Sequence, residues 1–114
     1  MSDASAPLKP AHHLILLLLA EEPTYGVALL ERIEDRSGGA IRLNAGSLYR
    51  TIAALVDEGL VEPLEEPSRP EGAGAPRKLY RTTGVGLSAL RNEARRQAEL
   101  LEAARALDLL EEQA

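Results

Sequence analysis

The stretch from residue 42 to residue 61 constrains the fold of this chain most, because both ends of a helix can be read from it. Asn44 belongs to the residue types whose side chains accept hydrogen bonds from the free amides of a helix start. Gly59 tolerates the left-handed backbone conformation that commonly ends a helix. We therefore predict a helix from about Ala45 to Glu58, and its first three turns contain no acidic residue.

Placed at about 100° per residue, this helix has one apolar face and one face of small residues. The small face lacks the Glu and Lys of an ordinary solvated surface, and it would let the helix approach a DNA groove closely. Arg50 adds one long cation to this face, and Ser47 and Tyr49 add hydroxyl groups at its flanks. An alanine-rich surface helix without a binding role is the alternative reading of this segment. The apolar face consists of Leu48, Ile52, Leu55 and Val56.

The length of 114 residues allows one small core, most simply a single domain with an appended helix. Three tyrosines are the only aromatic residues, so the core must consist of Leu, Ile, Val and Ala, which favours helix packing over a β sandwich. The chain has no cysteine, which excludes disulfides and thiolate metal sites. This composition permits a reducing compartment, and we expect a cytoplasmic protein.

The net charge of −5 argues at first sight against a nucleic-acid partner, but the charge is unevenly distributed. Residues 42–56 carry a net charge of +2 and residues 67–83 carry +3, whereas residues 57–66 carry −5. The positive charge is thus concentrated in two short segments. A modest basic surface on an acidic protein predicts weak non-specific DNA binding with a steep salt dependence.

The run from Leu14 to Ala20 is apolar on all sides and predicts a buried first helix that begins near Pro10. It is too short to cross a bilayer, which needs about 20 residues, and no small residues follow it where a signal peptidase would cleave. His12 and His13 are adjacent, so on a helix they point about 100° apart and cannot chelate one metal ion together. We predict no metal site and no membrane partner.

A second helix is predicted with Thr24 as its N-cap and its end at residues 38–39. Gly26 falls in the first turn of this helix, an unusual place for a glycine unless another group approaches closely. A short strand at residues 40–43 is expected to lead into the helix described above. Helix, helix, brief strand and helix is the order of a helix-turn-helix whose last helix reads DNA.

Residues 61–65 and 77–82 are predicted to form a β hairpin, in which Pro63 restricts the first strand to an edge. The loop between them is rich in Pro and Gly and contains Arg69. Such a loop is typical of a wing that contacts the minor groove or the DNA backbone. A long hairpin loop without a binding role is the alternative.

The last helix is predicted from about residue 84 to residue 112, with an apolar stripe at spacings of three and four residues. A helix of this length, roughly 40 Å, overhangs the core that the rest of the chain can make. It therefore needs a partner, and we predict a two-fold dimer through this helix and the first one. The predicted dimer contacts are Leu14, Leu17, Leu18, Leu87, Leu90, Ala94, Ala98, Leu101, Ala104 and Leu107.

Over about residues 14–90 the sequence resembles the PadR-like transcriptional regulators of bacteria, which are winged-helix proteins. The resemblance implies a mainly α fold with a small β hairpin, a winged helix-turn-helix, and a long C-terminal helix that dimerises. Val56 departs from the family, which often has an acid there, and Thr82 departs where an aliphatic residue is usual. The matching motifs are Tyr25-Gly26, Gly38-Gly39, Gly46-Ser47-Leu48-Tyr49, Glu58-Gly59-Leu60-Val61, Arg77-Lys78, Tyr80, and Thr83 with Gly86.

The resemblance also implies DNA-facing residues on the third helix, at the start of the second helix and in the wing. Arg69 is added from the charge of the loop and is not implied by the family. The full predicted DNA-binding set is Thr24, Tyr25, Asn44, Ser47, Tyr49, Arg50, Arg69, Arg77, Lys78 and Tyr80.

We therefore expect a flexible segment at residues 1–7, a winged-helix DNA-binding domain at residues 8–83 and a dimerisation helix at residues 84–114. The predicted function is that of a sequence-specific transcriptional regulator, a homodimeric repressor that binds double-stranded DNA at an inverted repeat. The alternative is a winged-helix dimer that binds protein partners and no DNA.

An enzyme is not expected, because no Ser/His/Asp grouping, phosphate-binding glycine loop or carboxylate pair stands in a recognisable context. We predict no catalytic residue and no cofactor. In the family, a small-molecule effector commonly binds at the dimer interface, where tryptophan stacks on flat ligands. This chain has no tryptophan, so a stacked planar drug is not expected. A smaller or aliphatic effector between the first and last helices, at the dimer interface, stays open, and the sequence indicates no particular one.

Overall fold

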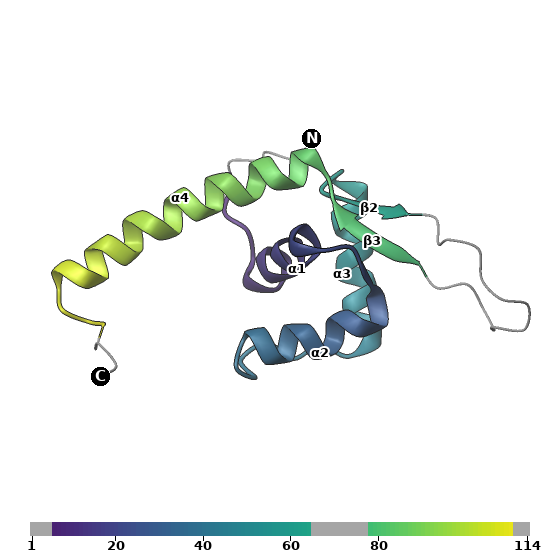
Figure 1. Ribbon diagram of the computed structural model, residues 1–114, viewed down its shortest axis with the longest axis horizontal. Helices are drawn as coiled ribbons and strands as arrows, with labels where there is room; N and C mark the ends of the chain where they lie inside the picture. Colours follow the sequence, from purple (N-terminus) through teal and green to yellow (C-terminus); the bar gives the residue numbers. More distant parts are fainter. Residues whose placement is uncertain (1–5, 65–77, 111–114) are drawn as a thin grey trace, which may run out of the picture.

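Three helices and a small sheet enclose the core in the part of the chain that the computed structural model describes, residues 6–64 and 78–110. A fourth helix begins against this core and extends beyond it (Figure 1). The elements in chain order are α1 (Pro10–Glu21), β1 (Thr24–Tyr25), α2 (Gly26–Arg36), α3 (Ala45–Asp57), β2 (Val61–Leu64), β3 (Leu79–Thr82) and α4 (Gly84–Ala106). The predicted fold class, a mainly α winged helix-turn-helix with a small hairpin and a long last helix, is confirmed.

Helix α1 lies at the centre of the core and begins at Pro10, as predicted. It contacts α2, α4 and β3, so it is covered on more than one side. This explains why its sequence is apolar all round, since a helix that is half solvated would need a polar face. Ile15 and Leu16 are fully buried, whereas Leu17 is partly exposed.

The sheet has the order β1-β3-β2, and both pairings are antiparallel. The predicted hairpin is confirmed within residues 61–64 and 79–82, and the predicted strand residues 65 and 77 lie outside the described residues. Strand β2 pairs with β3 alone, which leaves an edge for Pro63, opposite Tyr80. The expected edge position of Pro63 is therefore confirmed.

Two predictions about the segments on either side of α2 are wrong. Thr24 does not cap α2, because it lies in β1 and the N-cap position belongs to Tyr25, whose side chain makes no capping bond. The strand predicted at residues 40–43 is also wrong, since these residues have no regular structure. Thr24 instead pairs with Tyr80 of the distant strand β3, and a two-residue strand of this kind leaves no periodic pattern in the sequence.

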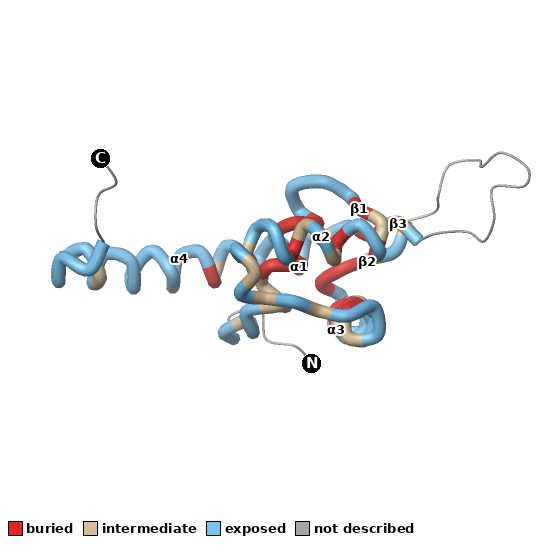
Figure 2. The backbone as a smooth tube through the Cα atoms, turned by 90° about the horizontal axis from the view of Figure 1, so that it is seen from below, coloured by how far each residue is buried: buried red, intermediate tan, exposed pale blue. Residues whose placement is uncertain are grey.

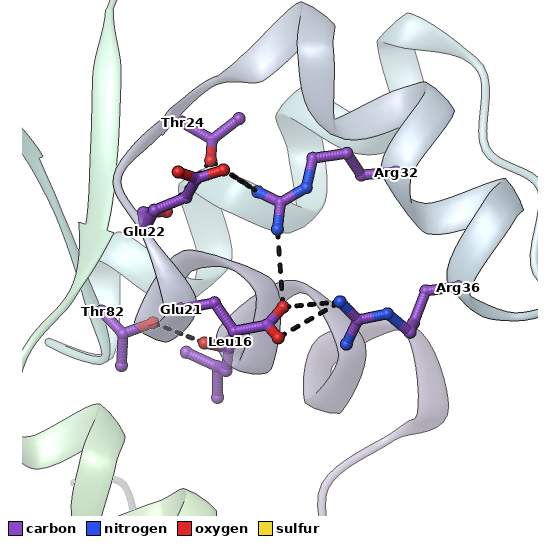
Figure 3. Close-up of polar contacts among 7 residues, drawn as sticks. All are labelled: Leu16, Glu21, Glu22, Thr24, Arg32, Arg36 and Thr82. Carbon is purple, nitrogen blue, oxygen red and sulfur yellow. Dashed lines mark hydrogen bonds and ion pairs between the residues drawn. The ribbon is translucent and has the colours of Figure 1, made fainter.

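A cluster of polar side chains fastens the end of α1 to α2 (Figure 3). Arg32 and Arg36 are one turn apart on α2, and both reach the carboxylate of Glu21, at 3.4 and 2.9 Å. Arg32 also donates a hydrogen bond to the Thr24 hydroxyl at 2.8 Å. Ion pairs this exposed contribute at most about 1 kcal/mol each. Together they link side chains of α1, β1 and α2.

The predicted ends of α3 are confirmed. The Asn44 side chain accepts a hydrogen bond from the Ser47 amide at 2.8 Å. Gly59 has a φ of +76°, and the Leu60 amide donates to the Leu55 carbonyl at 2.9 Å. These bonds satisfy groups that every helix end leaves free, so the short sequence signals act through local hydrogen bonding.

Helix α4 ends earlier than predicted, at Ala106 instead of residue 112. Asp108 adopts a φ of +57°, and the Leu109 amide bonds back to the Ala104 carbonyl at 2.9 Å. This is the hydrogen-bond pattern with which glycine-capped helices end, here formed by an aspartate, which tolerates the left-handed region better than most residues. The helix is 23 residues long, about 35 Å at 1.5 Å per residue.

Candidate nucleic-acid interface

Helix α3 is oriented by the three side chains that it buries in the core. Leu48, Ile52 and Leu55 are at most 1% exposed, so the opposite side of the helix must face solvent. Arg50 and the alanines at 53 and 54 lie on that exposed side. The division into an apolar face and a face of small residues, predicted from the sequence, is therefore confirmed.

The first turn of α3 presents an arginine and a hydroxyl together. Arg50 Nη2 donates to Ser47 Oγ at 3.2 Å, so the guanidinium is folded back over the start of the helix. Gly46 leaves room for it, because a Cβ at that position would stand 3.3 Å from Arg50 Nη1. Asn44 Oδ1 accepts the capping bond, so Asn44 could offer a DNA base its amide nitrogen and the second lone pair of Oδ1. The exposed Arg50 guanidinium and the half-buried Ser47 hydroxyl thus lie side by side at the helix start.

The ring of Tyr49 lies against the first residue of α2. A Cβ built on Gly26 would stand 2.8 Å from Tyr49 Cε1 and 3.0 Å from its hydroxyl oxygen. The close approach that the sequence predicted at Gly26 is therefore confirmed, and Tyr49 is the group that approaches. Tyr49 is nevertheless 46% exposed, so its other side remains open to solvent.

Two predicted DNA contacts are buried. Tyr80 is 8% exposed in the middle strand of the sheet, and burial, with a smaller effect of the nearby Tyr49, raises the pKa of its phenol. Thr24 is also 8% exposed, and its hydroxyl donates to the Glu22 carbonyl at 3.0 Å and accepts from Arg32. The DNA-contact roles predicted for Thr24 and Tyr80 do not agree with this burial. Both side chains are therefore part of the packed fold beneath the exposed surface.

A shallow cavity of about 210 Å³ lies between α3 and the hairpin. It brings Tyr49, Tyr80 and Lys78 together, although they are up to 31 positions apart in the sequence. Lys78 is exposed and places a positive charge beside α3. Arg69 and Arg77, the other predicted wing contacts, lie outside the described residues. The full lining is Tyr49, Ile52, Ala53, Val56, Asp57, Pro63, Lys78 and Tyr80.

Arg42 is a basic residue near the start of α3. It contributes to the positive charge of residues 42–56, but it is not in the DNA-binding set predicted from the sequence. It stands two residues before the cap of α3, and its side chain is 74% exposed. Its Nε lies 3.3 Å from Glu34 Oε1, an exposed ion pair that water and salt weaken. The net positive charge of residues 42–56 is the sequence signal that could have identified it.

The predicted dimer contacts fall into two groups. Leu14, Leu18 and Leu90 are buried in the core of the single chain, so for these three residues a dimer contact does not agree with the structure. The others on α1 and α4 are at least partly exposed, and Figure 2 shows that the part of α4 beyond the core is mostly exposed. The exposed leucines are Leu17, Leu87, Leu100, Leu101, Leu107, Leu109 and Leu110.

Glu93 is the one acidic residue of α4 that is buried among the described residues. Its carboxylate accepts a hydrogen bond from the Leu8 amide at 2.8 Å, and Arg96 lies 3.4 Å away. The hydrogen bond from Leu8 is the largest cause that lowers the pKa of Glu93, and Arg96 adds to it. This contact ties the segment before α1 to the inner half of α4.

Two further observations apply to residues 6–64 and 78–110. Their His, Asp and Glu side chains form no group of three or more that could hold a metal ion. None of their helices has the length and apolar character needed to cross a membrane.

The three-helix core, the three-stranded sheet and the exposed third helix define a winged-helix protein. The model of the transcriptional regulator PadR-like family matches residues 15–92. The chain therefore belongs to the PadR-like transcriptional regulator family, which confirms the resemblance noted in its sequence.

Solved structures of family members are similar to this chain in fold and in sequence. A PadR-like transcription factor from Bacteroides fragilis is 27% identical with a TM-score of 0.70, over 85% of this chain and 88% of that chain. A PadR family transcriptional regulator from Eggerthella lenta is 32% identical with a TM-score of 0.67, over 85% and 80% of the two chains.

A curated relative is the uncharacterized 37.1 kDa protein in transposon Tn4556 of Streptomyces fradiae, which is 38% identical over 90 residues. The match covers 79% of this chain and 24% of that protein. This chain thus spans about a quarter of the length of the curated relative.

Proposed function

We propose that this chain binds a specific operator as a homodimer and represses transcription from it. One observation carries the proposal: in residues 45–56 the exposed face of α3 has no acidic residue, and it presents Arg50, Ser47 and Tyr49. Lys78 adds positive charge beside it. Family membership supports a transcriptional regulator. Because the chain has a net charge of −5, DNA would bind only at this limited basic surface.

In this proposal α3 enters the major groove, where an arginine can make two hydrogen bonds to guanine. Arg50 is the residue proposed to read a base, and Ser47 and Tyr49 are proposed to bind phosphate or base edges. Lys78, with Arg69 and Arg77 as predicted from the sequence, would hold the wing on the backbone. Arg42 is proposed as an additional phosphate contact, because it is exposed just before the helix start.

The homodimer is proposed from the exposed leucines of α4. A helix that extends beyond the core leaves its leucine side chains exposed to water. A second copy packed against this helix would remove the apolar surface of these leucines from water. A two-fold dimer would place two α3 helices in successive major grooves about 34 Å apart. Sedimentation of the wild-type protein tests this point, and a monomer at micromolar concentration would contradict it.

DNA binding itself is tested by gel shift with the promoter of the protein's own gene at two salt concentrations. A repressor of the proposed kind shifts the promoter fragment, and the shift weakens steeply as salt increases, because phosphate contacts release counterions. A control duplex of equal length and scrambled sequence should bind much more weakly. Transcription in vitro from the same promoter, with and without the protein, then distinguishes a repressor from an activator.

The net charge of −5 favours one alternative, a winged-helix dimer that binds protein partners and no DNA. Such an adaptor would shift neither fragment at low salt. A small-molecule effector between the first and last helices stays a prediction, and the proposal assigns the chain no catalytic role.

A further inference from the structure

We propose that Gly26 is a positioning residue for Tyr49, and that its missing side chain is what keeps the Tyr49 ring on the DNA-facing side of α3. The inference concerns the interface in the proposed function, and it rests on that function for the part of the test that uses DNA. The positioning itself is a property of the free protein and can be tested without DNA.

The backbone does not require a glycine at position 26. Among the glycines of the described residues, positive φ angles occur at Gly38, Gly39 and Gly59. Gly26 is not among them and is the first residue of a regular helix. Its backbone conformation is open to any residue, and alanine would favour it, because glycine loses more freedom than alanine when a helix forms.

The space beside Gly26 does require a glycine, because it is filled by one side chain. A Cβ at this position would stand 2.8 Å from Tyr49 Cε1, 3.0 Å from its hydroxyl oxygen and 3.1 Å from Cζ. Carbon atoms in contact lie at about 3.5–4.0 Å, so a methyl group and the ring cannot both occupy this place. The three nearest atoms all belong to the outer part of the Tyr49 ring.

Gly86 is a contrasting case, because a side chain there would collide with the backbone of another segment. A Cβ there would stand 2.3 Å from the carbonyl oxygen of Leu60, a backbone atom that cannot move without the whole turn. At Gly26 the obstacle is the far end of a side chain, which can rotate. A methyl group at position 26 should therefore displace the Tyr49 ring and leave the fold in place.

The Tyr49 ring would be displaced from a defined position between two elements of the fold. Tyr49 now lies between the start of α2 and the cavity at the wing root, which also contains Lys78 and Tyr80. It thus touches Gly26 of α2 and also lines the hairpin cavity. A phenol held there presents its hydroxyl between two elements that flank the DNA in the proposed complex, whereas a ring rotated toward the cavity or into solvent does not.

The experiment compares Gly26→Ala, Tyr49→Ala, the double variant and Gly84→Ala with the wild-type protein. Gly84 is the matched control, because it is also the first residue of a helix and a Cβ there would meet no atom within 4 Å. Three measurements are made on each protein: thermal unfolding, proton NMR of the tyrosine rings without DNA, and affinity for one duplex. The duplex is the one that the wild-type protein selects from a random-sequence pool.

Gly26→Ala should melt no lower than the wild type. Its NMR spectrum should lack the nuclear Overhauser contact between Tyr49 and position 26. It should bind the duplex about tenfold more weakly, as expected for one lost contact group. Gly84→Ala should match the wild type in affinity. In the Tyr49→Ala background, adding Gly26→Ala should change affinity by less than about twofold, because the residue it acts through is gone.

The inference is overturned if Gly26→Ala leaves the Tyr49 resonances and the affinity unchanged. An equal loss of affinity in the Tyr49→Ala background would also overturn it, as would a loss of folding that Tyr49→Ala does not restore. If the wild-type protein selects no duplex, the proposed function fails, and the NMR and melting results still decide whether Gly26 positions the ring.

Discussion

The hydroxyl of Thr82 donates a hydrogen bond to the carbonyl oxygen of Leu16 at 2.8 Å, across 66 positions of the sequence (Figure 3). It joins the last residue of β3 to the middle of α1, and so holds the sheet against the central helix. The family resemblance led us to expect an aliphatic residue at position 82, and this contact explains how a threonine is accommodated there.

Thr82→Val should therefore lower the free energy of unfolding by about 0.5–1.5 kcal/mol, the usual contribution of one hydrogen bond. Valine has nearly the same shape, so packing against Gly86 should be retained. Urea unfolding measures the change, and Thr82→Ser, which keeps the hydroxyl, is the control for the hydrogen bond. A valine variant as stable as the wild type would show that the bond contributes nothing.

Gly86→Ala should destabilise the protein by about 1–3 kcal/mol, the range for adding a methyl group to a filled interior. The added Cβ would meet the Leu60 carbonyl oxygen and the Thr82 methyl group, both within 2.5 Å. Gly84→Ala, two residues earlier in an open position, should be neutral or stabilising by about 0.4–1 kcal/mol. Chemical unfolding of both variants checks the contrast, and equal stabilities would contradict it.

Substitutions at Asn44 should separate folding from DNA binding. Asn44→Ala removes the cap of α3 and should cost about 1 kcal/mol of stability. Asn44→Asp keeps a capping oxygen and should leave stability near the wild-type value. The added negative charge should repel DNA phosphates, so this variant should bind the selected duplex more weakly at low salt. Undiminished DNA affinity in Asn44→Asp would remove Asn44 from the interface.

Arg50→Ala should lose roughly 1–3 kcal/mol of operator binding and discriminate less well at one base position. Folding should be unaffected, because Arg50 is exposed and its bond to Ser47 is local. Arg91→Ala removes an exposed arginine of α4 and controls for the loss of one positive charge. Titration of each variant with the selected duplex and with its single-base variants provides the measurement. Unchanged affinity would exclude the assignment of Arg50 as the base contact.

The stability of the protein should fall in acid partly through Glu93. The hydrogen bond from Leu8 lowers the pKa of Glu93 in the folded state below its ordinary value of 4.5. The contribution of this carboxylate is therefore fully present above pH 4.5 and is lost as the pH falls toward the lowered folded pKa. Glu93→Gln should flatten this part of the stability curve, measured by urea unfolding at several pH values. An acid limb equal to that of the wild type would contradict this role.

Much of the candidate interface could be predicted from the sequence, because its signals are local. The cap at Asn44, the stop at Gly59 and the apolar periodicity of α3 act within one or two turns, so they fix which side chains the helix exposes. The charge pattern further identified Lys78. Arg42 was missed because its charge alone does not show that it lies exposed beside the helix start.

The sequence by itself determined the approximate positions of the helices, the ends of α3, the hairpin and the exposed face of α3, since each follows from hydrogen bonds or burial along a single element. Only the tertiary structure decided that Thr24 pairs with Tyr80, that Tyr49 fills the space at Gly26, and that three predicted dimer leucines lie in the chain's own core. These relationships join segments far apart in the chain. They depend on how the packed elements fit together, which no local pattern encodes.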